Sequence, residues 1–217
     1  MTDTSQISKL FRRSLELDCR LADTTGQDLL GSSPIDPRQR IVLAASKVSI
    51  EHGQSARLLL LGECAPNSGA ALVRAQYEAL IRSVWLQFCA SDDEILRLAA
   101  PLNVVSEQGA KNIAGPLDML IEIQKRAPDA LHLQLSAFRD AQWKSLNSFV
   151  HAGIHPLSRV TGGFPVELAI QIAKTSNALA HLAYRVCASI AGNERLAAVT
   201  HAHREFDDCF PPLGALP

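Results

Sequence analysis

Histidine, arginine and asparagine crowd into one short segment of the sequence, NSFVHAGIHPLSR. Within it, Asn147, His151, His155 and Arg159 recur at four-residue intervals. An imidazole can take up or release a proton near neutral pH, and a guanidinium can hold a phosphate or a carboxylate. This segment is therefore the first candidate for acid–base chemistry on an anionic substrate, with His151, His155 and Arg159 as candidate catalytic residues and Asn147 beside them.

Two other interpretations of the segment stay open. On a helix, His151 and His155 would form an HxxxH pair able to bind a metal. However, Pro156 disfavours helical backbone for the residue before it, and a nearby glycine weakens the turn. We therefore expect a loop over residues 151–165 and no metal. His151 would then end the preceding helix, a place that the helix dipole favours for histidine without any catalytic role.

The second candidate is a charged pair, Arg74 and Glu78, in ALVRAQYEALIRSVWL. At helical spacing both residues lie on the face that carries Ile81, Trp85 and Phe88. Removing such a pair from water costs several kcal/mol per ion unless each ion finds partners. The pair either fixes the packing of helices or lines a cleft, in which Glu78 orients Arg74 and Arg74 holds an anion.

Further polar residues lie on the long helix expected over residues 166–191. Asn177, His181 and Tyr184 share one side of it, while apolar residues cover two sides. A helix that is apolar on two sides lies at the centre of its bundle. These three polar residues are therefore either hydrogen-bonded core groups or the remaining wall of a cleft.

The elements that must position these residues are expected to be helices. Leu and Ala each occur 30 times, and no long segment alternates with period two. We predict one all-α domain over residues 1–217, a bundle of about seven helices. It has an N-terminal helix within 1–24 and an irregular tail over 209–217. The main helices are expected over about 4–22, 37–64, 69–90, 117–126, 129–150, 166–191 and 193–208, with Ser91 capping a further short helix.

Composition excludes some classes of function. The net charge of -1 argues against a protein that coats nucleic acid. The longest apolar segment, 178–191, is interrupted by His181 and Arg185 and is too short to span a membrane. The five cysteines are scattered without a CxxC pair, so we expect free thiols in a cytoplasmic protein. We expect no cofactor.

ALVRAQYEALIRSVWL, followed about seventy residues later by NSFVHAGIHPLSR, resembles a group of bacterial helical proteins of unknown function that are distantly related to the HEPN superfamily. The resemblance covers roughly residues 66–191. It implies an all-α bundle, often dimeric, of the kind found in toxin–antitoxin and phage-defence systems. Many of these relatives cut RNA without a metal, using an Arg and a His four to six residues later; the His acts on the 2′-hydroxyl or the leaving oxygen.

The sequence departs from that Arg–His spacing. Arg139 begins RDAQWK, which contains no histidine. A site of this kind would have to be built from Arg74, Glu78 and His151. The sequence thus predicts a homodimeric, HEPN-like bundle that processes RNA. The alternatives are a dimeric bundle without enzymatic activity, which binds a partner protein or a small ligand, and a metal-dependent enzyme using His151, His155 and Glu78.

Overall fold

The computed structural model describes residues 2–26, 36–62, 64–110 and 113–212, and every regular element in these ranges is helical. The predicted all-α class is therefore confirmed for this part of the chain. The helices are α1 (Thr2–Thr25), α2 (Pro37–Leu61), α3 (Pro66–Phe88), α4 (Asp92–Ala99), α5 (Val104–Ala110), α6 (Pro116–Arg126), α7 (Asp129–Val150), α8 (Ile154–Gly162), α9 (Val166–Ala191) and α10 (Asn193–His201). Two 3-10 turns follow, η1 (Ala202–Arg204) and η2 (Asp207–Cys209).

The expected number of seven helices is too low, because ten are found in the described residues. One addition is α5, which lies between the short helix capped by Ser91 and the helix expected from residue 117. The last helix stops at His201 rather than near 208, and η1 and η2 replace its final turns. Residues 210–212 of the tail have no helical structure, as expected. Residues 27–35 and 213–217, which belong to a predicted loop and to the tail, lie outside the described residues.

The prediction of a loop over residues 151–165 is wrong, because α8 occupies most of that segment. Pro156 is the third residue of α8. A backbone N–H has no acceptor within its own helix in the first turn, so a proline there removes no hydrogen bond. Ser148 of α7 also supports the start of α8, since its Oγ accepts from the His155 N–H at 3.1 Å.

Side-chain caps begin two of the helices, and the one at Ser91 confirms the prediction. Ser91 and Glu94 form a complete capping box at the beginning of α4. Asp36 accepts from the Gln39 N–H and caps α2, whose first residue is Pro37. These contacts satisfy N–H groups that a helix leaves unpaired at its N-terminus.

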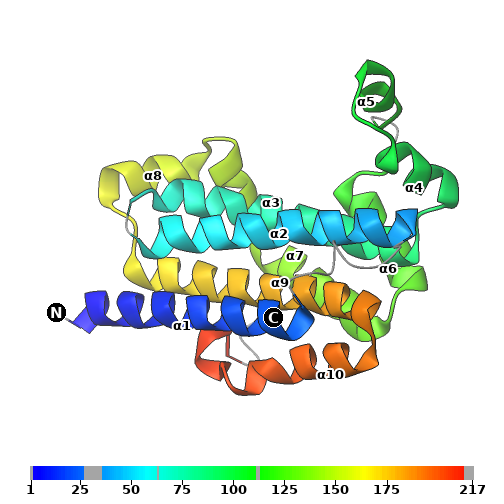
Figure 1. Cartoon of the computed structure of the whole chain (residues 1–217). Coiled ribbons are helices and arrows are strands. Elements are labelled where there is room, and N and C mark those ends of the chain that lie inside the picture. The colour runs from blue at the N-terminus through cyan, green and yellow to red at the C-terminus, as the bar shows by residue number, and fades with distance from the viewer. Residues whose placement is uncertain (1, 27–35, 63, 111–112, 213–217) are drawn as a thin grey trace.

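The centre of the bundle is formed by α2, α3 and α9, with α2 antiparallel to α3 and packed against both partners (Figure 1). Two glycines of this centre permit close approach. A Cβ at Gly53 would collide with the side-chain amide of Gln76, and one at Gly69 would lie 2.8 Å from the Ala56 carbonyl oxygen. The small residues of α2 and α3 therefore bring polar side chains together inside the bundle.

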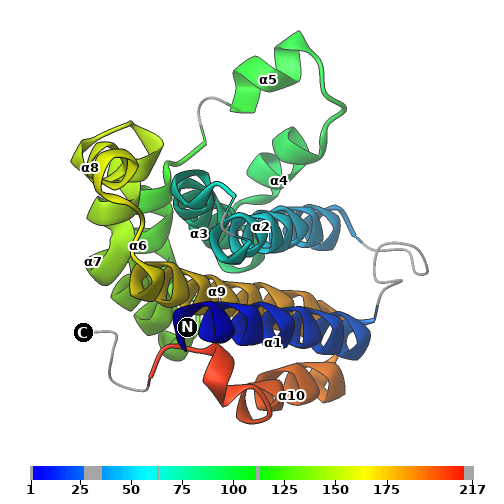
Figure 2. The ribbon, with the colours of Figure 1, turned by 90° about the vertical axis from the view of Figure 1, so that its left-hand side faces the viewer.

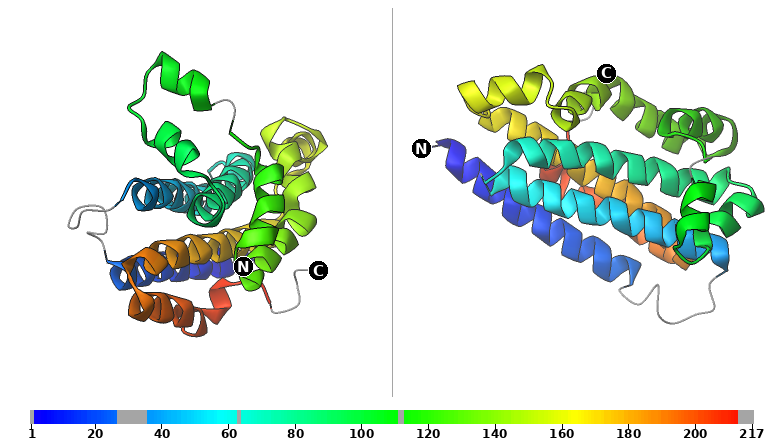
Figure 3. Two further views of the ribbon diagram at one scale, coloured as in Figure 1. Left: turned by 90° about the vertical axis from the view of Figure 1, so that its right-hand side faces the viewer. Right: turned by 90° about the horizontal axis from the view of Figure 1, so that it is seen from above.

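The outer helices cover this centre from two sides. α1 and α10 pack on α9, whereas α6 and α7 pack on α3 (Figure 2 and Figure 3). α4 contacts α2, whereas α5 projects away from the bundle (Figure 1). Residues 202–212, here called the C-terminal strap, run back along α1 and α9.

Candidate functional site

Arg74 on α3 is held by three groups of the protein. Its Nε and Nη2 donate to Glu78 Oε1 at 3.0 and 2.6 Å, and its Nη1 donates to Asn147 Oδ1 at 2.8 Å. Its guanidinium carbon lies 3.1 Å from the centroid of the Trp143 ring, one turn before Asn147 on α7. A single cation therefore joins α3 to α7.

The pair formed by Arg74 and Glu78 is less buried than its place on the apolar face predicts. The Arg74 side chain is 12% exposed, whereas that of Glu78 is 38% exposed. Glu78 thus reaches solvent, and Arg74 already has hydrogen-bond acceptors and an aromatic ring within the protein. This arrangement favours the interpretation that the pair fixes helix packing over the one in which Arg74 awaits an anion.

The histidines of the first candidate segment lie at the junction of α7 and α8. His151 is exposed at the end of α7, one turn beyond Asn147. His155 is half-buried in the first turn of α8, where its ring stacks on Phe149 with 5.9 Å between centroids. Arg159 is also half-buried, and its Nε has no hydrogen-bond partner. Within the described residues, no hydrogen bond or ion pair joins these three residues to Arg74.

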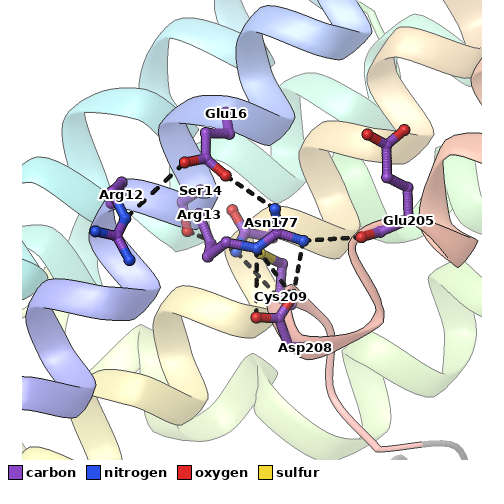
Figure 4. Close-up of polar contacts among 8 residues, drawn as sticks. All are labelled: Arg12, Arg13, Ser14, Glu16, Asn177, Glu205, Asp208 and Cys209. Atoms are coloured by element: carbon purple, nitrogen blue, oxygen red, sulfur yellow. Dashed lines mark hydrogen bonds and ion pairs between the residues drawn. The ribbon is translucent and has the colours of Figure 1, made fainter.

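The polar residues of α9 face other partners. Asn177 is buried, and its Nδ2 donates to Ser14 Oγ at 2.9 Å and to the Cys209 carbonyl at 3.0 Å (Figure 4). His181 faces a cavity beside α7, and Tyr184 faces a groove beside α1. The structure thus places these three residues apart from Arg74 and Glu78, in contact with α1, α7 and the strap.

The cavity beside His181 has a volume of about 420 Å³. It lies between α7, α9 and the C-terminal strap. Its walls are mostly apolar, and no described residue that lines it is acidic. The lining residues are Gln134, Phe138, Thr175, Ala178, Leu179, His181, Leu182, Arg185, Thr200, His203, Phe210, Pro211 and Pro212.

Arg185 supplies the positive charge of this cavity. Its Nη1 makes one long contact, 3.5 Å, with Gln134 Oε1, and its Nε is buried without a hydrogen-bond partner. Burial lowers the pKa of the guanidinium below its usual value. A half-buried cation with an unpaired donor interacts more strongly with an anion that enters the cavity than a fully solvated cation does.

His181 contributes a neutral ring to the same cavity. Its Nε2 lies 2.9 Å from the Val199 carbonyl oxygen and can only donate to it, so in the neutral ring Nδ1 is left as an acceptor. Burial lowers the pKa of His181 to about 4, and the neighbouring charge of Arg185 adds to this effect. At neutral pH the ring therefore adds no charge beside Arg185.

The strap that closes the cavity is fastened to α1. Arg13 donates to the Asp208 carboxylate at 3.3 and 3.4 Å and to the Glu205 carbonyl at 2.8 Å (Figure 4). Its guanidinium also lies over the Phe206 ring. Asn177 holds the backbone of Cys209 from the other side. These contacts fix the turn that places Phe210 and the following prolines against the cavity.

A buried polar network is the feature that the sequence analysis missed. Arg57 of α2 forms an ion pair with Asp18 of α1, and its Nη1 donates to Ser176 Oγ at 3.0 Å. Ser176 Oγ lies 2.7 Å from Gln76 Oε1 and donates to it. The sequence does contain one signal of this network. Small residues spaced three and four apart precede Arg57 on its side of the helix and end with Gly53, so this side packs closely against another helix. A cation on such a side needs a partner inside the protein.

Arg185 was missed as a site residue for a different reason. Arg185 and His181 lie four residues apart and interrupt an apolar helix. In the sequence alone, this pattern indicates only that the helix does not span a membrane. The neighbours of Arg185 from α7 and the strap come from distant parts of the chain, so spacing on one helix does not predict the cavity.

The described residues contain neither a metal-binding cluster nor a membrane-spanning helix. No group of three or more His, Cys, Asp or Glu side chains is placed to hold a metal ion there. Nor does that part of the chain contain a helix of the length and apolar character needed to cross a membrane.

These observations define an all-helical bundle with a mostly apolar cavity that one arginine lines. Residues 46–212 match the family of unknown function DUF6988, and the chain belongs to this family. The match includes all of the residues that line the cavity, whereas α1 precedes it. No curated protein and no solved structure matches the chain.

Proposed function

We propose that the chain binds a small organic anion with a flat apolar body in the cavity between α7, α9 and the C-terminal strap. This proposal rests mainly on Arg185. Its buried Nε has no hydrogen-bond partner, and none of the described residues that line the cavity is acidic. A carboxylate can accept two parallel hydrogen bonds from a guanidinium, which gives both strength and orientation.

The size and the walls of the cavity indicate the rest of the ligand. Its volume of about 420 Å³ is in the range of small-molecule sites. Its lining includes the aromatic side chains of Phe138 and Phe210 and the aliphatic side chains of Leu179 and Leu182. An arylcarboxylate would place its ring against these side chains and its charge at Arg185, and both parts would lose contact with water.

Thermal shift and calorimetric titration test this proposal with benzoate, 2-naphthoate and octanoate, each beside its neutral amide. Hydrogen bonds to a charged group contribute about 1.5–3 kcal/mol, so at least one carboxylate should bind about 10- to 150-fold more tightly than its amide. Arg185→Gln should remove this difference. If no carboxylate binds better than its amide, the proposal is wrong.

Arg82→Gln is the matched control. Arg82 is an exposed arginine on α3, far in sequence from the residues that line the cavity. The same substitution there should leave the preference for the carboxylate unchanged. An equal loss in both variants would show that the anion binds through general surface charge.

Metal-independent RNA processing by a HEPN-like homodimer is a second proposal. It is favoured by the place of His151, an exposed imidazole one turn from the Asn147 that binds Arg74. In this proposal His151 acts as the acid or base. Arg159, which lies at the same junction of α7 and α8, supplies the positive charge near the phosphate. Toxin or phage-defence activity and a cytoplasmic location are part of this proposal, whereas binding of a partner protein belongs to the alternative of a dimeric bundle without enzymatic activity.

A further inference from the structure

A second hollow, separate from the proposed anion site, lies along α1. It is a groove of about 500 Å³ between α1 and α2, with Tyr184 of α9 at its base. Its walls combine polar and apolar side chains. The lining residues are Phe11, Ser14, Leu15, Asp18, Cys19, Ala22, Asp23, Gln54, Ser55, Arg57, Leu58 and Tyr184.

Asp18 is the unusual group in this groove. Its side chain is 8% exposed, and only Oδ2 is paired, with Arg57. Oδ1 is buried without a hydrogen-bond partner. Burial raises the pKa of the Asp18 carboxyl. The charge and hydrogen bond of Arg57 act in the opposite direction, as does a weaker interaction with the Gln54 side chain, which makes no well-formed hydrogen bond to Oδ1. A buried carboxylate oxygen that accepts no hydrogen bond is costly, so a donor supplied by a ligand would stabilise it.

The polar groups of the groove suit a ligand that donates hydrogen bonds better than they suit an anion. The Arg57 guanidinium is already bound to Asp18 and Ser176. The lining also offers the hydroxyl oxygen of Ser55 and the side-chain amide of Gln54. An ammonium group has three donors and no acceptor, which fits walls that are rich in acceptors.

The rim of the groove indicates an apolar body for this ligand. Leu15 of α1 is 51% exposed and Leu58 of α2 is 55% exposed, and both line the groove. Phe11 lies beside them, and the Tyr184 ring lies below. Apolar side chains that face one hollow from two helices lose contact with water when an apolar ligand fills it.

We propose that the groove between α1 and α2 binds a small primary amine with an apolar body, its ammonium group at the Asp18 carboxylate and its body between Leu15 and Leu58. This site does not depend on the anion cavity, because the two share none of their lining residues. It would give the protein a second, oppositely charged class of ligand.

Cys19 provides a direct test, because it is exposed and lines the groove. In a Cys64→Ser protein, the rate at which a thiol reagent modifies Cys19 is measured with phenethylamine or octylamine added. At about three times its Kd, an amine leaves about a quarter of the sites free, so the rate should fall about fourfold. A rate that neither amine lowers overturns the proposal.

Two controls separate occupancy of the groove from other effects. Cys64 is also exposed but does not line the groove, so in a Cys19→Ser protein its modification rate should not change. 2-Phenylethanol and octanol, which lack the ammonium charge, should protect Cys19 much less than the amines. Equal protection by amine and alcohol overturns the assignment of the charge to Asp18.

Asp18→Asn should abolish the protection by amines. Since this variant leaves Arg57 buried without its anion, it can fail to fold. Ser55→Phe therefore serves as the second variant, because it fills the groove from its α2 wall and leaves the ion pair in place. Binding of amines, measured calorimetrically, should be lost in Ser55→Phe; undiminished binding there overturns the proposal.

Discussion

The guanidinium carbon of Arg74 lies 3.1 Å from the centroid of the Trp143 ring, so α3 and α7 meet at a cation over an indole face. Such contacts contribute about 0.5–2 kcal/mol, with the larger values where water is excluded. Glu78 and Asn147 accept hydrogen bonds in the plane of the guanidinium and fix its orientation. The cluster therefore sets the position of α7, which carries one wall of the anion cavity.

We predict unequal effects of removing the two charges of this cluster. Arg74→Ala loses the ring contact and the hydrogen bonds to α7, and should lower the free energy of unfolding by about 2–3 kcal/mol. Glu78→Ala should cost about 1 kcal/mol or less, because its side chain is 38% exposed and solvent screens the pair. Urea denaturation followed by circular dichroism measures both values.

Arg82→Ala, on the exposed side of the same helix, is the control for helix propensity and net charge. Its effect should stay within about 0.5 kcal/mol. Equal losses in the Arg74 and Glu78 variants would contradict the prediction, since they would mean that the ion pair, rather than the contact with α7, carries the stability.

The second prediction concerns acid pH. The pKa of His181 is lowered from 6.5 to about 4. As the pH falls between these values, the unfolded chain takes up the proton and the folded chain does not, so stability that is present above pH 6.5 is lost. The loss amounts to about 3 kcal/mol by pH 4. Urea denaturation at intervals from pH 7 to pH 4 measures it.

His181→Gln should flatten this pH dependence, because glutamine can still donate to the Val199 carbonyl but does not titrate. His201→Gln, a change at an exposed histidine of α10, should leave the dependence as it is in the wild type. A wild-type slope that persists in His181→Gln would show that another group is responsible.

The third prediction is that Arg13 and Asp208 control the opening of the strap. Their side chains are 25% and 38% exposed, so the pair should contribute about 0.5–1 kcal/mol to holding the strap closed. Breaking it should increase the open population about two- to fivefold. Cys209 reports on this opening, because it belongs to the strap, is fully buried while the strap is closed, and burial raises the pKa of its thiol to about 12.

Modification of Cys209 is measured in a protein that lacks Cys19 and Cys64, the two exposed cysteines. Asp208→Asn should raise the rate by the predicted factor, and Arg12→Gln should not, because Arg12 forms its ion pair with Glu16 of its own helix. A strap that opens equally in both variants would indicate that Asn177 and packing, rather than the ion pair, hold it.

Much of the fold could be predicted from sequence, because long helices depend on local periodicity. α7 and α9 begin and end at the predicted residues, and the cap at Ser91 is found. α8 was missed because Pro156 was judged by its effect on the preceding residue. In the first turn of a helix this effect is outweighed, since a missing N–H costs nothing there.

The candidate sites were less predictable, because each depends on packing between distant segments. The sequence places Arg74 and Glu78 on one face, but the contact with Trp143 requires α7, which lies far along the chain. The partner of Arg57 is Asp18, in a helix that precedes the region of the family match. Periodicity shows which side of a helix is buried, and it does not show which helix covers that side.

The fourth prediction tests RNA processing through His151. If this exposed imidazole is the acid or base, the purified protein should cleave RNA in the presence of EDTA, and His151→Ala should lose at least about 100-fold in rate, the usual contribution of such a group. His201→Ala, at another exposed histidine, should cleave as the wild type does. Cleavage is followed on total RNA by gel electrophoresis, with the three proteins prepared identically. Equal cleavage by all three would assign the activity to a contaminating nuclease, and no cleavage by any would favour the binding function of the cavity at Arg185.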